Sequence, residues 1–267
     1  MPDVYVSIET ADEAVLERLV EVLELRAAEP AQQAMLDDYL ADLPLPDGAR
    51  VLEVGCGTGA VARAIAGRSG IGSVVGLDPS PVFVEHARRL AEGVDDLSYV
   101  VGSGTALPFD DGAFDAVVFH TVLSHIPDAG GALAEAARVT AAGGALAVFD
   151  GDYATTTVAL GDHDPLQACA DAAMAALVHD RYLVRRLGTL VRAAGWEVAR
   201  LRSHGYVENE DPGYILTLID RGADTLVAAG RLGEAAADAL RAEARRRVAA
   251  GEFFGHIAYA SLIARRP

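Results

Sequence analysis

The sequence predicts a doubly wound α/β fold, in which helices cover both faces of a mostly parallel sheet. A short apolar run, Val51 to Val54, leads into three glycines on alternate positions and then into the helix-forming run Ala60 to Ala66. This order indicates a buried strand, a tight turn and the start of a helix. The next apolar run ends at Asp78, roughly 20 residues after the glycines, which is typical of nucleotide-binding folds of this class.

The composition limits the number of domains and the class of partner. The chain has 267 residues, of which 51% are hydrophobic, and this length suits a single domain spanning residues 1–267. The formal net charge of −17 argues against nucleic acid or an anionic membrane as a partner. There is no apolar run near the roughly 18 residues of a membrane span, and the first residues do not resemble a signal peptide. Cys56 and Cys169 lack metal-site spacing, so we expect a cytoplasmic, disulfide-free protein.

The glycine turn predicts a ligand site. Glycine permits positive φ and lets a ligand approach the backbone, and the following helix start presents free N–H groups. Glu53 stands at the end of the preceding strand. Its carboxylate would repel a pyrophosphate but suits a ligand with an ammonium group or hydroxyls, which disfavours an NAD-type oxidoreductase.

The stretch E-V-G-C-G-T-G resembles the first motif of class I S-adenosylmethionine-dependent methyltransferases, in the branch similar to ubiquinone/menaquinone-biosynthesis and natural-product methyltransferases. The resemblance implies a Rossmann-like sheet of seven strands, S-adenosyl-L-methionine as cofactor and S-adenosyl-L-homocysteine as product. It also implies transfer of a methyl group to an O, N or C atom of a small molecule by direct displacement. The residues of this motif expected to bind the cofactor are Glu53, Gly55, Cys56, Gly57 and Gly59.

A second matching block begins at the end of the next strand, Ser73 to Leu77. Its sequence G-L-D-P-S-P-V-F-V-E-H-A is similar to the family's second motif. We expect Asp78 to accept hydrogen bonds from the ribose hydroxyls and Phe83 to pack on the adenine, where the family often has Met. The alternative for Asp78 is an N-cap of the following helix. Pro79 and Ser80 belong to the same predicted cofactor contact.

The third block, Leu97 to Asp128, resembles the family's adenine loop and fourth strand, with the strand itself at Phe114 to His120. The family's acidic adenine contact is Ser103 here, which is a departure, because a hydroxyl binds without the assistance of charge. Adenine recognition is therefore expected to involve backbone groups of the residues that follow, namely Gly104, Thr105 and Ala106.

Histidines near strand ends are candidates for catalysis. His120 ends its strand where such folds place ligand contacts, and we expect it to contact the cofactor; His125 follows on the next turn. A histidine base would help an oxygen acceptor, whereas a carboxylate such as Asp152 or Glu208 would orient an amine. The alternative for any of these histidines is a packed or supporting group. The candidates for the base or orienting role are His120, His125, Asp152, His163 and, less centrally, His204.

A polar segment after the fifth strand could be interpreted as a divalent-metal cluster. It contains Asp150, Asp152, His163 and Asp164. Their spacing has no diagnostic pattern, and Asp and His are ordinary turn and cap residues. We therefore predict no metal.

Two segments lie outside this core. Residues 1–46 are expected to form a helical cover, with helices at 12–28 and 31–40, in which Tyr5 or Arg26 reaches the cofactor or is simply solvated. Residues 205–251 are an insertion between the sixth strand (197–203) and the last strand (253–264), with helices at 214–229 and 233–250. We expect a lid over the acceptor site, and the alternative is a contact in a homodimer. The remaining elements are expected at 145–149 (strand), 166–178 and 185–196 (helices).

Two further functions stay open at this level, because fold alone does not decide chemistry. One is a cofactor-binding enzyme of non-methylating, cyclase-like chemistry. The other is a non-catalytic protein that binds the cofactor. The main prediction remains a methyltransferase acting on a small, secondary-metabolite-like molecule.

Overall fold

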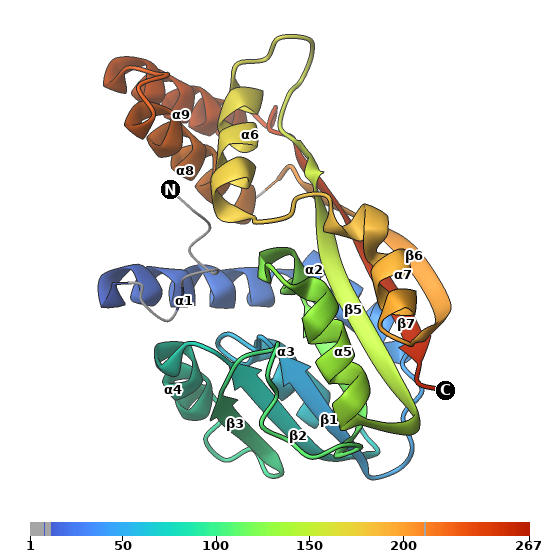
Figure 1. Ribbon diagram of the computed structural model, residues 1–267. Coiled ribbons are helices and arrows are strands. Elements are labelled where there is room, and N and C mark those ends of the chain that lie inside the picture. Colours follow the sequence, from blue (N-terminus) through green and yellow to red (C-terminus); the bar gives the residue numbers. More distant parts are fainter. Residues whose placement is uncertain (1–7, 9–11, 211) are drawn as a thin grey trace.

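A computed structural model describes residue 8 and residues 12–210 and 212–267, apart from the side chains at 13 and 14. Tyr5 lies outside the described residues. The strands form one seven-stranded sheet in the order β3-β2-β1-β4-β5-β7-β6 (Figure 1). The first five pair in parallel, and β7 runs antiparallel to both β5 and β6. The predicted doubly wound, mostly parallel fold is confirmed. The strands are β1 (Ala49–Val54), β2 (Ile71–Asp78), β3 (Leu97–Val101), β4 (Phe114–His120), β5 (Thr140–Thr157), β6 (Glu197–Glu208) and β7 (Gly255–Arg265).

Helices cover both faces of the sheet. One buried cluster joins the strands to α2, α3 and α4, and a second joins their other face to α5 and α7. Both clusters form because β1 and β4 are buried along nearly their whole length and contribute mainly apolar side chains to both faces. The helices are α1 (Glu13–Ala28), α2 (Pro30–Ala41), α3 (Ala60–Ala66), α4 (Pro81–Leu90), the short 3-10 helix η2 (Leu123–His125), α5 (Ala129–Val139), α6 (Leu166–Leu177), α7 (Leu183–Ala193), α8 (Tyr214–Ala228) and α9 (Glu234–Ala249).

The fifth and sixth strands are longer than the sequence indicates. The fifth was expected to end at Phe149 but continues to Thr157, and the sixth continues from Ser203 to Glu208. The extension of β5 pairs with β7 up to Asp152, which lies opposite Ala258, and again at Thr157, opposite His256, with a register irregularity between the two. Antiparallel partners supply these backbone hydrogen bonds independently of apolar periodicity, so the hydrophobic pattern did not mark them.

The extended strands carry a second helical layer away from the sheet (Figure 1). It consists of α6, α8 and α9, and we call it the helical layer. Gly222 in α8 lies so close to the Cys169 carbonyl in α6 that a Cβ would overlap with it. The first four residues of the predicted insertion are strand, so its helical part begins at Tyr214.

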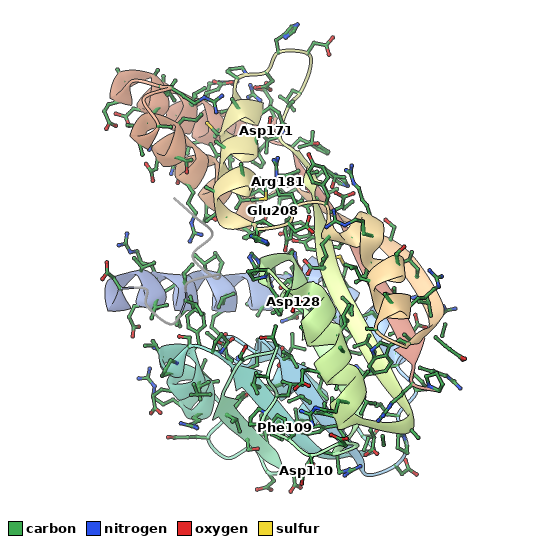
Figure 2. All side chains as sticks on the ribbon, in the orientation of Figure 1. Phe109, Asp110, Asp128, Asp171, Arg181 and Glu208 are labelled. Atoms are coloured by element: carbon green, nitrogen blue, oxygen red, sulfur yellow. The ribbon has the colours of Figure 1, made fainter. Side chains whose placement is uncertain are left out.

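Glu208 lies where the helical layer joins the sheet (Figure 2). It is buried, and its carboxylate accepts hydrogen bonds from the Tyr206 hydroxyl and from the backbone N–H groups of Tyr214 (3.0 Å) and Ile215 (2.8 Å). A carboxylate at this position satisfies free N–H groups at the start of α8. Glu208 therefore holds the first turn of α8, and the structure does not support the expectation that it orients an amine acceptor.

Candidate functional site

A cavity of about 860 Å³ lies beyond the carboxyl ends of the parallel strands. Its walls come from the turns after β1, β2 and β4 on one side, and from α1, α2, α6 and α8 on the others. Such a volume is at the upper end of the range for small-molecule sites. Twelve sequence-predicted residues line it, and these are Glu53, Gly55, Cys56, Gly57, Asp78, Pro79, Phe83, Ser103, Gly104, Thr105, His120 and His125.

The glycine turn has the geometry that the sequence indicates. Gly55 has φ +72° and Gly59 has φ +79°. A Cβ on Gly55 would overlap with Val122, and one on Gly59 would overlap with the Tyr99 hydroxyl. These positions therefore exclude a side chain both by backbone conformation and by lack of space. Gly59 supports the turn without lining the cavity.

Asp78 organises the turn that it faces. Its carboxylate accepts hydrogen bonds from the N–H groups of Gly57 (2.9 Å) and Ser80 (2.9 Å). Burial raises the pKa of Asp78 to about 6, and these two amides partly offset the increase. The N-cap of α4 is Ser80, whose hydroxyl accepts from the Phe83 N–H, so the N-cap alternative for Asp78 is wrong. The ribose contact stays a prediction.

Glu53 is buried beside this carboxylate and lines the cavity. It is 2% exposed, and its Oε2 has no hydrogen-bond partner among the described residues. Burial, followed by a smaller contribution from Asp78, raises the pKa of Glu53 to about 8. A buried carboxylate of this kind is stabilised by a ligand that brings an ammonium group or hydroxyls. S-adenosylmethionine carries both, so the residues present fit it.

The predicted adenine side is only partly in the cavity. Phe83 lines it from α4 and is 1% exposed, packing with Leu16 and Leu19 of α1. The Ser103 hydroxyl is 3.0 Å from the Thr105 hydroxyl, which holds the loop in a turn. The predicted contacts Ser80 and Ala106 are not among the lining residues.

His120 is held as a neutral ring. Its Nδ1 is 3.0 Å from the Tyr39 hydroxyl, and its ring stacks on Phe149 with centroids 4.8 Å apart. Burial, with a smaller contribution from Arg26, lowers the pKa of His120 to about 3. The Tyr39 hydroxyl has no other hydrogen bond among the described residues, so we assign it as the donor to Nδ1, which places the proton on Nε2. A ring with this pKa is a poor base, and the contact of His120 with the cofactor stays a prediction.

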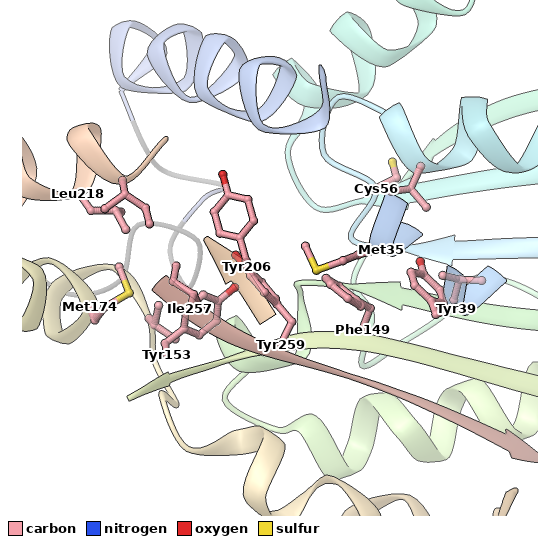
Figure 3. Close-up of a cluster of buried hydrophobic side chains, with 14 of the residues drawn as sticks. Met35, Tyr39, Cys56, Phe149, Tyr153, Met174, Tyr206, Leu218, Ile257 and Tyr259 are labelled. Atoms are coloured by element: carbon pink, nitrogen blue, oxygen red, sulfur yellow. The ribbon is translucent and has the colours of Figure 1, made fainter. Parts of the chain in front are cut away.

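Tyr39 was not expected in the site. An aromatic residue at helical spacing is usually core, and Tyr39 is also fully buried. Figure 3 shows it at one end of a row of aromatic side chains that includes Phe149 and Tyr259 and extends toward the helical-layer residues Met174 and Leu218. Phe149 stacks on both tyrosines, with centroid separations of 5.3 and 5.1 Å.

His125 lines the cavity from η2 with a buried carboxylate behind it. Asp150 is completely buried and accepts hydrogen bonds from Ser124 N (3.0 Å), Ser124 Oγ (2.9 Å) and Gly151 N (2.8 Å). Burial raises the pKa of Asp150, and the nearby charge of His125 acts in the opposite direction. Asp150, considered in the sequence only as a metal ligand, thus fixes the segment that carries His125.

Two predicted catalytic residues, Asp152 and His163, do not line the cavity, so the structure does not bring them together with the other candidates. Asp152 pairs with Arg185 at 2.9 Å. His163 is exposed on the loop before α6, with φ +64°. The polar sequence of this segment gave no indication that β5 extends and carries it away from the parallel strand ends. His204, the less central candidate, instead contacts the Ser261 hydroxyl at 2.8 Å.

The residues weighed as metal ligands have separate partners. Asp164 pairs with Arg247 at 2.6 Å, while Asp150 and Asp152 make the contacts described above. Within the part of the chain that the structure describes, there is no group of three or more His, Cys, Asp or Glu residues that could hold a metal ion.

The N-terminal cover reaches the site through Arg26. Its guanidinium lines the cavity and donates to the Thr121 hydroxyl at 2.5 Å. Thr121 is buried and has φ +54°, with its N–H donating to the Phe149 carbonyl. A threonine in this conformation is strained, and its neighbours hold it at the end of β4.

The other end of the cavity is lined by the helical layer and the extended β5. Its side chains are mainly apolar or aromatic, and the only charged group among them, within the described residues, is a half-buried arginine. These residues are Tyr153, Met174, Leu177, Val178, Tyr214, Leu218 and Arg221. No described helix is both long and apolar enough to cross a membrane.

Comparison with known proteins relates this chain to methyltransferases. Residues 52–148 match the family described as a methyltransferase domain. A demethylmenaquinone methyltransferase of Tropheryma whipplei is 38% identical over 103 residues, covering 39% of this chain and 42% of that protein. The chain spans between a third and a half of the length of such curated relatives. For two others, the matched part is 49% and 34% of the relative's own length.

Solved structures share the fold over most of the chain. A putative methyltransferase of Bacillus halodurans has a TM-score of 0.63 at 21% identity, covering 87% of this chain and 98% of that one. The [4+2]-cyclase SpnF has a TM-score of 0.56 at 25% identity, covering 90% and 85%. Residues 52–148 are therefore a methyltransferase-family domain, and the predicted resemblance of this chain to class I methyltransferases of the quinone and natural-product branch is confirmed.

Proposed function

We propose that this protein is an S-adenosylmethionine-dependent methyltransferase acting on a small molecule. The observation that carries the proposal is the buried, unpartnered Glu53 Oε2, which lines the cavity beside the glycine turn. Such a carboxylate needs a cationic or hydroxyl-bearing ligand and disfavours a pyrophosphate. When bound, the cofactor supplies an activated methyl group on a sulfonium.

The cofactor-binding role is assigned to the strand-end residues. Glu53 and Asp78 offer the only two carboxylates among the described lining residues that are more than nine-tenths buried. The backbone of the glycine turn allows close approach, and Phe83 and the 103–106 loop lie on the adenine side. His120 would donate through Nε2–H to an oxygen of the cofactor or acceptor.

The acceptor would lie between this edge and the helical layer, which we propose acts as a lid. Since displacement at a sulfonium depends chiefly on alignment, enclosure and positioning can supply much of the rate enhancement. For an oxygen acceptor we assign the base to His125, which lines the cavity, with Asp150 orienting its segment. This pairing of a base with a buried orienting group is a common arrangement in enzymes. A role in cytoplasmic natural-product metabolism is part of the same proposal.

A thermal-shift panel with S-adenosylmethionine, S-adenosylhomocysteine, NAD and NADP tests the proposal. A ligand at about 100 times its Kd adds about 2.7 kcal/mol to the free energy of unfolding. Shifts with the two S-adenosyl compounds alone are expected. A shift with a nicotinamide cofactor alone would refute the assignment of Glu53.

The likeness to SpnF keeps cyclase-like chemistry as a second candidate. It predicts that S-adenosylmethionine binds but is not consumed, and that the product has the mass of the substrate. A methyltransferase instead forms one S-adenosylhomocysteine per product, with the mass of one added methylene. The dimer alternative for the helical layer is tested by the molar mass in solution.

A further inference from the structure

The cavity contains a buried amide whose polar atoms have no hydrogen-bond partner. Gln32 lies in the first turn of α2, lines the cavity and is 5% exposed. Both its Oε1 and its Nε2 lack a partner among the described residues. Its backbone is fixed, because its N–H donates to the Glu29 carboxylate at 2.8 Å. A buried amide without partners is unfavourable, and native proteins keep few of them.

A second buried polar group lies next to it. The Tyr259 hydroxyl is also without a hydrogen bond, and the residue is 1% exposed. Burial raises the pKa of the Tyr259 phenol, and the nearby Gln32 side chain lowers it slightly. The geometry between the two side chains nevertheless does not complete a hydrogen bond. The stack of Tyr259 on Phe149 holds that ring in place. Among the described residues, no group therefore completes a hydrogen bond with the Gln32 amide.

The surroundings restrict what could satisfy it. The helical-layer end of the cavity has apolar and aromatic walls and, among its described residues, no carboxylate. An ammonium-bearing acceptor would have no counter-charge there. Arg221 is the one charged group on this wall, half-buried on α8. A glutamine amide is neutral and presents an NH2 donor group beside a carbonyl acceptor, so its natural partner is a neutral group that also presents a donor and an acceptor side by side.

We propose that Gln32 is the polar anchor of the acceptor, and that the acceptor is a neutral, mainly apolar molecule presenting a hydrogen-bond donor and acceptor side by side, as a carboxamide or a hydroxyl beside a carbonyl does. The inference rests on the proposed function, because it names the ligand of the acceptor half of the same cavity. It makes Gln32 a specificity-determining residue on the cover helix α2, outside the glycine turn and the strand ends.

The test uses three probes with one ring skeleton, namely salicylamide, phenol and salicylate. Each is titrated by ligand-observed NMR into the full chain saturated with S-adenosylhomocysteine. Wild type is expected to bind salicylamide best. Q32L is expected to bind salicylamide about tenfold more weakly, because the variant loses a buried pair of hydrogen bonds to the ligand. Its affinity for phenol is expected to be unchanged. Q33L is the matched control, because Gln33 is exposed and already donates to the Ala27 carbonyl.

Stability separates an anchor from a structural role. Q32L removes two unpartnered polar atoms, so the melting temperature of the ligand-free variant is expected to stay equal or rise. Q32L is expected to bind S-adenosylhomocysteine as tightly as wild type does. If wild type itself does not bind S-adenosylhomocysteine, the proposed function is refuted, and not only the role of Gln32. Three results would overturn the proposal: no salicylamide binding to wild type, equal binding to Q32L, or a lower melting temperature for Q32L. Preference for salicylate that R221Q abolishes would show an anionic acceptor and would overturn it too.

Discussion

Replacing Glu53 with glutamine separates cofactor binding from stability. The Glu53 side chain is 2% exposed with one unpartnered oxygen, and burial raises its pKa to about 8. At pH 7 the ligand-free protein therefore contains mostly the neutral acid, which glutamine matches in shape and charge. We expect E53Q to match the stability of wild type at low pH, where both states carry the protonated acid, and to be at least as stable at pH 7, because only wild type must keep a proton that its unfolded chain has lost.

Binding of the cofactor should change far more. A hydrogen bond to a charged group contributes about 1.5–3 kcal/mol, which corresponds to a dissociation constant about 10- to 150-fold higher in E53Q. Because wild type must ionise Glu53 to make this contact, its affinity should increase with pH up to about 8, by at most about tenfold per unit. Titration calorimetry with S-adenosylhomocysteine between pH 6.5 and 8.5 (about two units) measures both effects. E53Q should lack this pH dependence.

The stability of the ligand-free protein should change with pH in the opposite direction. The folded state keeps the Glu53 proton up to about pH 8, whereas the unfolded chain loses it near 4.5. The native state thus binds more protons between these values, so the free energy of unfolding falls as pH rises through them, by up to about 1.4 kcal/mol per unit. Urea unfolding should show a flatter profile for E53Q. Equal cofactor affinity in both proteins, or a large loss of stability in E53Q at pH 7, would refute the reasoning.

Three other substitutions test separate parts of the site. D78N should raise the dissociation constant of S-adenosylhomocysteine about tenfold or more by calorimetry, because it removes a charged acceptor; unchanged affinity would contradict the ribose assignment. G59A should destabilise the protein by about 1–3 kcal/mol in urea unfolding, because φ is +79° and the Cβ meets Tyr99. G222A should separate α6 from α8 at Cys169, lowering the melting temperature while sparing cofactor affinity; turnover equal to wild type would argue against a lid.

The residues predicted for the cofactor lie together at one edge of the sheet, for a physical reason. Strand, glycine turn and helix lie within a few residues of each other, so local pattern and three-dimensional site coincide there. Glu53, Gly57 and Asp78 are brought together by parallel strand ends, as the doubly wound fold requires. The number of seven strands was instead implied by the family resemblance, and the structure has it.

The rest of the site depends on pairing that has no local signal. The position of Asp152 depends on how far β5 continues along β7, which apolar periodicity does not encode. His120 was predicted as a cofactor contact, but its lowered pKa comes from burial and from Arg26 in another helix, which the local sequence does not show. Asp150 was considered only as a potential metal ligand. Its buried hydrogen bonds to Ser124 depend on the three-dimensional fold and give no signal in the local sequence.

The proposed cofactor edge and the proposed acceptor end differ in whether they fall within the segment that matches the family. The matched segment, residues 52–148, contains the glycine turn, Asp78 and His125. The residues that line the acceptor end, such as Gln32, Tyr153 and Leu218, all lie outside it. On the proposed function, the segments that would specify the acceptor are therefore the cover helix, the extension of β5 and the helical layer. The identity of the acceptor is therefore to be sought through these segments, and Gln32 is the residue there whose unsatisfied hydrogen bonds restrict it most.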